Sequence, residues 1–129
     1  MQIAPDLMDR MVEHARRDAP DECCGVVVSR DGVAEVVHEL ENLAASPLRF
    51  EVDGMALHGV LTEAEDAGAT LGAIYHSHTR SAPYPSQTDV NFAAGWPGVE
   101  WVIVGLAGAD PEVRSYLIEG GAVREVAIT

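Results

Sequence analysis

The alternation of apolar and polar residues along the chain predicts three helices. Residues 5–17 place apolar side chains at helical spacing, with charged residues at the remaining positions. A second helix is expected over residues 53–67, because Asp53 can cap its first turn and Gly68 ends the segment. A third and shorter helix is expected over residues 86–94.

Seven short apolar runs, rich in β-branched residues, have the length and composition of strands. Asp31-Gly32 separates the first two runs and predicts a tight hairpin turn. The mixed order of helices and strands predicts an α/β fold with a mixed central sheet flanked by helices. The expected strands cover residues 24–29, 33–40, 48–52, 71–77, 100–106, 113–118 and 122–128.

Composition predicts one globular domain over residues 1–129. The chain is 47% hydrophobic, which is enough for one sizeable core. It has no run of about 18 apolar residues, and its first residues lack the basic and apolar regions of a signal peptide, so we expect a cytoplasmic protein without a membrane segment. Two cysteines that cannot form a disulfide scaffold fit a reducing compartment. Monomeric and oligomeric states are both compatible with these features.

The charge of the chain limits its partners. The net charge is −13, and all eight basic residues are arginine, so a nucleic-acid-binding surface is not expected. An acidic protein also repels acidic partners. We therefore expect a substrate-binding face that is locally neutral or that uses Arg49 and Arg80.

The stretch with recognisable chemistry is His76-Ser77-His78, followed after seven residues by Ser86 and then by Asp89. Two histidines two positions apart on a strand point to the same side. Asp89 falls in the first turn of a helix that returns toward them. Two His and one Asp suit a divalent cation, above all zinc, and three protein ligands leave a fourth position open, as in catalytic zinc sites.

Other interpretations of these residues remain open. Ser-x-x-Asp before an apolar segment is also a helix capping box, so Ser86 is expected to cap the helix in either case. Two His and one carboxylate can also hold non-haem iron, which metal analysis would distinguish from zinc. The remaining histidines, His14, His38 and His58, lack a ligand partner at suitable spacing and are expected at solvated surface positions.

A hydrolytic metal site needs a base, and Glu22 is the candidate because it enters the strand that begins at Cys24. The adjacent Cys23 and Cys24 could bind a metal, form a strained disulfide or supply a nucleophile. No second cysteine pair accompanies them, and the complete metal motif explains the histidines without cysteine catalysis. We expect both thiols to be reduced and buried, as small apolar residues.

Together these residues resemble the signature of the JAMM (MPN-plus) metalloproteases. That signature is an early glutamate, then His-Ser/Thr-His, seven residues, Ser, two residues and Asp, and it is complete here as Glu22, His76-Ser77-His78, Ser86 and Asp89. The resemblance covers essentially the whole chain and is strongest with the small bacterial members. Many relatives have proline after the second histidine, where this chain has Thr79. The resemblance implies a single MPN domain with a cytidine-deaminase-like fold.

The same resemblance implies a role for each residue of the signature. His76, His78 and Asp89 would be the ligands of one Zn²⁺ ion per chain. Glu22 would act first as general base and later as general acid, and Ser86 would donate a hydrogen bond to the oxyanion. The implied reaction is hydrolysis of an amide bond.

The resemblance also implies a substrate class. Small bacterial relatives act on ubiquitin-like sulfur-carrier proteins that end in Gly-Gly, and the similarity is strongest to actinobacterial enzymes that release cysteine from such a carrier. Residues 46–50 are the candidate strand for the carrier's tail, although they could equally be an ordinary edge strand. The alternatives are a peptidase that trims or deconjugates other ubiquitin-like proteins, and a non-catalytic MPN scaffold, which usually lacks the ligands present here.

Overall fold

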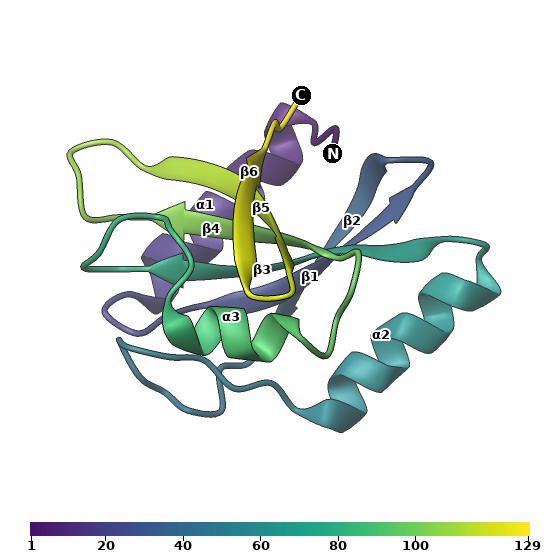
Figure 1. Cartoon of the computed structure of the whole chain (residues 1–129), viewed down its shortest axis with the longest axis horizontal. Coiled ribbons are helices and arrows are strands. Elements are labelled where there is room, and N and C mark those ends of the chain that lie inside the picture. Colours follow the sequence, from purple (N-terminus) through teal and green to yellow (C-terminus); the bar gives the residue numbers. More distant parts are fainter.

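A computed structural model describes residues 1–129 and shows a six-stranded sheet with helices on both faces (Figure 1). None of the three helices combines the length and the apolar character that crossing a bilayer requires. The helices are α1 (Pro5–Asp18), α2 (Gly54–Asp66) and α3 (Gln87–Ala93). The strands are β1 (Cys24–Arg30), β2 (Val33–Leu40), β3 (Thr70–His78), β4 (Glu100–Gly105), β5 (Glu112–Glu119) and β6 (Ala122–Val126).

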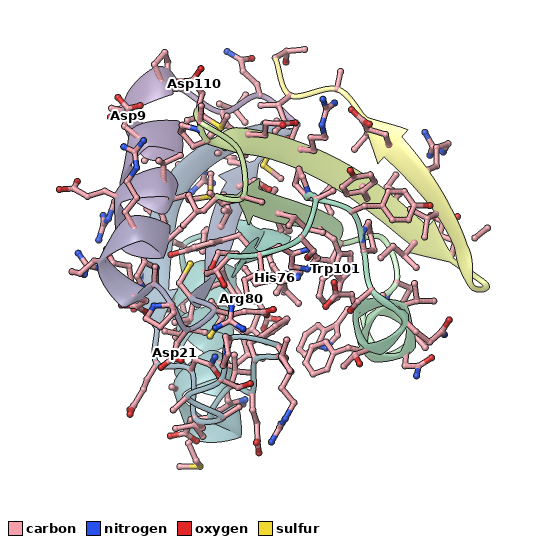
Figure 2. All side chains as sticks on the ribbon, turned by 90° about the vertical axis from the view of Figure 1, so that its left-hand side faces the viewer. Asp9, Asp21, His76, Arg80, Trp101 and Asp110 are labelled. Carbon is pink, nitrogen blue, oxygen red and sulfur yellow. The ribbon has the colours of Figure 1, made fainter.

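The sheet is mixed, with the strand order β2-β1-β3-β4-β5-β6. β3 and β4 pair in parallel, whereas all other neighbours are antiparallel. The carboxyl ends of β3 and β4 therefore lie at the same end of the sheet, which faces the viewer in Figure 2. This architecture confirms the predicted mixed α/β fold.

The two faces of the sheet carry separate hydrophobic cores. Because successive side chains of a strand point to opposite faces, Val27 and Tyr75 pack on the side of α1, whereas Val26 and Ile74 pack on the side of α2 and α3. Figure 1 shows the same division, with α1 behind the sheet and the other two helices below it. The central strands are thus buried on both faces, which fixes their register.

The local signals in the sequence correspond to the observed element ends. Asp53 caps α2 by accepting a hydrogen bond from the backbone N–H of Met55 at 3.0 Å, and Gly68 follows the helix with a φ of 75°. Asp31 and Gly32, with φ values of 51° and 79°, form the hairpin turn between β1 and β2. Both glycines adopt the left-handed conformation that other residues avoid.

The strand predicted over residues 48–52 is wrong, because the whole segment between β2 and α2 is a loop. Its backbone groups bond within the loop: the N–H of Leu43 donates to the carbonyl of Glu51 at 2.8 Å. The apolar pattern that suggested a strand arises because Phe50 packs against the α2–α3 core. Residues 46–50 therefore offer no strand to which a peptide tail could be added.

His14 is buried, which corrects the expectation that it lies on the surface. Its Nδ1 atom is 2.7 Å from the hydroxyl of Tyr75, and its Nε2 atom is 3.2 Å from a carboxylate oxygen of Asp18. Because Tyr75 sits on a buried strand, its hydroxyl needs a partner inside the protein, and His14 on the apolar stripe of α1 supplies it. His58 is exposed as predicted, and His38 is half-buried.

Gly25 allows the ring of Tyr75 to lie directly against the backbone of β1. A Cβ atom at this position would be 2.3 Å from the ring and 2.5 Å from the carbonyl oxygen of His38. We predict that Gly25→Ala lowers the free energy of unfolding by about 1–3 kcal/mol, as overpacking does, when measured by urea denaturation. Gly59→Ala in α2 is the control, because a Cβ there meets no atom within 4 Å. It should stabilise the helix by about 0.5–1 kcal/mol, and equal effects of the two substitutions would contradict this packing argument.

Candidate metal centre

β3 presents two histidines from its carboxyl end. His76 and His78 follow Ile74 in the strand's alternation, so all three side chains lie on the face covered by α2 and α3. Both imidazoles are buried, with 0% of His76 and 5% of His78 exposed. The two histidines thus lie on one side of the strand, as predicted.

Asp89 reaches these histidines because of the way α3 begins. Ser86 is the N-cap, and its Oγ atom accepts a hydrogen bond from the N–H of Asp89 at 3.1 Å. In return Oδ2 of Asp89 accepts a hydrogen bond from the N–H of Ser86 at 2.9 Å. The predicted capping box is therefore formed, and it directs the buried carboxylate back toward β3.

Three potential ligand atoms converge at this point. Nε2 of His76 is 3.1 Å from Nε2 of His78 and 3.1 Å from Oδ2 of Asp89. Nε2 of His78 is 3.3 Å from the same oxygen of Asp89. A tetrahedral ion with bonds of about 2.0 Å separates its ligands by about 3.3 Å, so the triangle has the size of one face of such a site. His76, His78 and Asp89 could therefore hold one metal ion and leave its fourth position open.

The surroundings orient the two imidazoles. Nδ1 of His78 lies 2.9 Å from the carbonyl of Ala82; donation to this carbonyl leaves Nε2 free to bind a metal. The ring of His76 stacks on Phe50, with centroids 4.6 Å apart and planes 28° from parallel. The ring of Trp101 also meets the ring of His76 edge-on, and Figure 2 shows Trp101 next to His76.

The loop between β3 and α3 is anchored at both ends. The hydroxyl of Thr79 donates to the carbonyl of Pro20 at 3.0 Å, which ties the start of the loop to the segment that precedes β1. Further along, the hydroxyl of Tyr116 donates to the carbonyl of Pro83. The spacer of seven residues thus has a defined course from the histidines to the start of α3.

Glu22 lies opposite His78, on the same face of the sheet. The antiparallel pairing of β1 with β3 places Cys24 opposite His76, and continuing this register by two residues places Glu22 opposite His78. Glu22 is buried, with 5% of the residue exposed. The structure thus brings the predicted base next to the predicted ligands, although 54 or more residues separate them in the sequence.

Burial and mutual contacts separate the pKa values of the acidic groups. Burial raises the pKa of Glu22 to about 7, and the charges of His78 and Asp89 act on it in opposite directions. Burial also acts to raise the pKa of Asp89, but hydrogen bonds from His76 and His78 outweigh it and hold that pKa well below its usual range. Asp89 is therefore ionised at neutral pH, whereas Glu22 can gain and lose a proton there.

The two cysteines lie beside the site as buried, free thiols, which confirms the expected packing role. Burial raises the pKa of both thiols to about 12, so neither is a thiolate near neutral pH. The backbone N–H of Cys23 donates to Oγ of Ser77 at 2.8 Å. The middle residue of the His-Ser-His motif therefore secures the segment that carries Glu22.

Sequence reasoning missed two residues that shape this site. The side-chain amide of Asn42 donates to the backbone carbonyl of Glu22 at 2.9 Å, and Phe50 stacks on His76. Both lie in the loop between β2 and α2, where Asn42 was an isolated asparagine and Phe50 was one aromatic residue in a run expected to form a strand. Neither signal is specific for a functional site.

Comparison with known families agrees with this geometry. Residues 4–119 match the family described as prokaryotic homologs of the JAB domain. The chain belongs to this family, and its resemblance to the JAMM and MPN proteins is thereby confirmed.

Several relatives with described activities are similar over most of the chain. The CysO-cysteine peptidase of Mycobacterium tuberculosis is 41% identical over 95% of this chain and 86% of the relative. The Desampylase of Haloferax volcanii is 32% identical, over 99% of this chain and 94% of the relative. A probable TtuB-protein conjugate cleaving protease of Thermus thermophilus is 37% identical, over 95% and 77% of the two chains.

Solved structures share the fold. A protein of Desulfitobacterium hafniense superposes with a TM-score of 0.85 and 30% identity, covering 99% of this chain and 90% of the other. A JAB1/MPN domain protein from Archaeoglobus fulgidus superposes with a TM-score of 0.68, covering 99% and 96% of the two chains. At 19% identity, the second similarity concerns the fold alone.

The convergent ligands predict that a divalent metal stabilises the folded protein. Free metal at about a hundred times its dissociation constant should add about 2.7 kcal/mol, visible as a higher melting temperature that a chelator reverses. His78→Ala should abolish the increase because it removes one of three ligands. His58→Ala, at an exposed site in α2, is the control and should keep it. An identical metal response in both variants would show that the ion binds elsewhere.

Proposed function

We propose that this chain is a zinc-dependent hydrolase that cleaves the amide bond after the C-terminal Gly-Gly of a ubiquitin-like sulfur-carrier protein, releasing cysteine from a carrier–cysteine adduct. The observation that carries the proposal is the convergence of His76, His78 and Asp89 with Glu22 opposite them. The 41% identity to a CysO-cysteine peptidase supports this substrate class. Residues 1–129 would act as a single domain, since segments from both halves of the chain form the site.

Zinc fits the donor set of two imidazole nitrogens and one carboxylate oxygen at tetrahedral spacing. When bound there, it would polarise the scissile carbonyl and make a water molecule nucleophilic near neutral pH. Glu22 would accept the proton of the attacking water and pass it to the leaving nitrogen. A carboxyl whose pKa is raised by burial suits both steps, because it holds and releases a proton more readily near neutral pH than an exposed glutamate does.

Ser86 can cap α3 and stabilise an oxyanion at the same time. Capping uses a lone pair of its oxygen, which accepts the N–H of Asp89, whereas its hydroxyl proton has no acceptor within the protein. The side chain is also exposed to solvent. Ser86 would therefore donate its proton to the developing oxyanion without giving up the cap.

Of the two arginines expected at the substrate-binding face, Arg80 is the one available to an anionic group. Arg49 pairs with Glu51 at 3.7 Å, whereas Arg80 is exposed and forms no ion pair. Arg80 follows His78 by two residues, and Figure 2 shows it on the side of the molecule where His76 lies. We assign to Arg80 the contact with the carboxylate of the amino acid attached to the carrier.

A second candidate function is the cleavage of conjugates between a ubiquitin-like protein and another protein. The similarity to the Haloferax Desampylase and to the Thermus conjugate-cleaving protease favours it. Both functions use the same three metal ligands with Glu22 and Ser86, and they differ in the leaving group. An iron oxygenase would leave Glu22 and Ser86 without a role, and a scaffold without catalysis would need none of the ligands.

Incubation with two substrates tests the proposal. One is a carrier with a C-terminal cysteine after Gly-Gly, and the other is the same carrier joined to a lysine side chain of a second protein. Mass spectrometry should show release of cysteine from the first, by a protein that contains close to one zinc per chain in elemental analysis. Faster cleavage of the second substrate would favour the deconjugating function. Iron in place of zinc, or no cleavage of either, would overturn the hydrolase assignment.

Glu22→Gln should lower kcat by about 10² or more while the zinc content stays near that of the wild type. The amide keeps the size of the side chain but cannot accept a proton. Since the base form of Glu22 is the active one, kcat/KM of the wild type should rise as pH increases through the pKa of Glu22. Burial raises this pKa to about 7, and a nearby cation would lower it, so the rise should lie below pH 7. A variant that loses its metal together with its activity would instead identify Glu22 as a ligand.

Ser86→Ala should lower stability by about 1 kcal/mol through loss of the cap, and kcat by roughly 10² to 10³ with KM little changed. Asp53→Ala is the matched control, because Asp53 caps α2, which carries none of the predicted site residues. It should cause a similar loss of stability with turnover near that of the wild type. Single-turnover rates and thermal melting of both variants separate the two effects. A zinc-loaded Ser86→Ala protein that works at the wild-type rate would remove Ser86 from the mechanism.

A further inference from the structure

Asn42 uses the full hydrogen-bonding capacity of its side chain. An amide offers two N–H donors and an oxygen with two lone pairs. Here Nδ2 donates to the carbonyls of Glu22 at 2.9 Å and Arg49 at 3.1 Å. Oδ1 accepts from the N–H groups of Ala44 and Glu51, each at 3.0 Å. One side chain thus replaces the regular hydrogen bonds that the loop between β2 and α2 lacks.

The backbone of Glu22 is held on both sides by this loop. Its N–H donates to the carbonyl of Ser46 at 2.9 Å, and its carbonyl accepts from Asn42. The carboxylate of Glu22, in contrast, has no hydrogen-bond partner within the protein. The position of the carboxylate relative to the metal ligands therefore depends on where these backbone bonds hold residue 22.

The same loop contacts the metal centre a second time. Phe50, next to Arg49, stacks on the imidazole of His76 with centroids 4.6 Å apart, and its ring lies 5.7 Å from that of Phe92 on α3. A loop held in one shape by Asn42 therefore contacts the proposed base through its backbone and a proposed ligand through an aromatic ring.

We propose that Asn42 is a positioning residue: it sets the distance between Glu22 and the metal ligands without touching metal or substrate. The inference deepens the proposed function, because it takes Glu22 to be the base. Its effect should be on turnover, since an error of about 1 Å in the placement of a catalytic group can cost about 10²-fold in rate.

Asn42→Ala, which removes all four hydrogen bonds, is the main test. We expect kcat to fall by about 10- to 100-fold, with KM within about twofold of the wild type and zinc content unchanged. Asn91→Ala is the matched control, because Asn91 is an exposed residue of α3 whose side chain bonds only to Gln87, at 2.9 Å. It should behave like the wild type. A rise in KM with kcat unchanged in Asn42→Ala would mean that Asn42 acts on substrate binding, and would overturn the proposal.

The charge of the site needs a separate control. Asn42→Asp keeps the two accepted hydrogen bonds but loses both donated ones, and it adds a negative charge near Glu22. If Asn42 acts by position, the Ala and Asp variants should both be slow at the pH optimum. If only the Asp variant is slow and its pH profile moves to higher pH, the effect is electrostatic and the positioning role is wrong.

A double-mutant cycle shows whether Asn42 acts through Glu22. Once Glu22→Gln has removed the base, adding Asn42→Ala should change the remaining rate by less than about twofold. Independent roles would multiply the two losses. If the two rate losses multiply in the double variant, Asn42 acts on folding or on another part of the site, which would contradict the proposal.

Amide hydrogen exchange gives a readout that needs no activity. In Asn42→Ala the N–H groups of Glu22, Ala44 and Glu51 should exchange faster, whereas Asn91→Ala should leave them unchanged. Suppose that the wild type cleaves no carrier substrate but that these amides still exchange faster in Asn42→Ala. The proposed reaction is then wrong, whereas the finding that Asn42 holds the backbone of Glu22 is kept. If the wild type is active and Asn42→Ala keeps both its rate and its exchange pattern, the positioning role fails alone.

Discussion

The antiparallel pairing of β1 with β3 is the interaction on which the rest of the structure depends. Both strands are buried on both faces, so their register is set by two hydrophobic cores and not by the metal site. A slip of one residue would turn the two histidines to the α1 face. The register places Cys24 opposite His76, and Glu22 arrives opposite His78 as a consequence. The energy that sets the register between β1 and the strand carrying the two histidines therefore comes from apolar burial.

The side chains on the two faces of β3 have different roles. His76 and His78 point toward α3 and Asp89, whereas Tyr75 and Ser77 point toward α1. The residues on the α1 side contact the neighbouring strand β1. Ser77 accepts a hydrogen bond from the backbone N–H of Cys23, and Tyr75 packs against the backbone of β1. Polar chemistry on one face is thus supported by hydrogen bonds and packing on the other.

Much of the fold and the central ligands could be predicted because their signals are local. The spacing of His76 and His78 on an apolar run, and of Ser86 and Asp89 at a helix start, specifies geometry within a few residues. Glu22 could be linked to them only through the motif as a whole, because strand pairing joins residues far apart in sequence.

The features that sequence reasoning missed have no repeating pattern. Asn42 holds the loop between β2 and α2 through four hydrogen bonds of one side chain. No periodic pattern in the sequence indicates such a role. The same loop contains the wrongly predicted strand, where apolar residues pack individually and not in a ladder. The prediction for His14 was wrong because a polar residue on an amphipathic helix is usually exposed to solvent. Here His14 is buried and is the hydrogen-bond partner of the buried Tyr75 hydroxyl.

One oxygen atom of Asp89 links the proposed metal site to the first turn of α3. Oδ2 accepts a hydrogen bond from the backbone N–H of Ser86, the N-cap, and it also faces Nε2 of His76 and of His78. A duplicated gene released from selection for catalysis could not change this carboxylate without also weakening the first turn of α3. Ser86 would still cap the helix through the backbone N–H of residue 89, but the reciprocal bond to its own N–H would be lost.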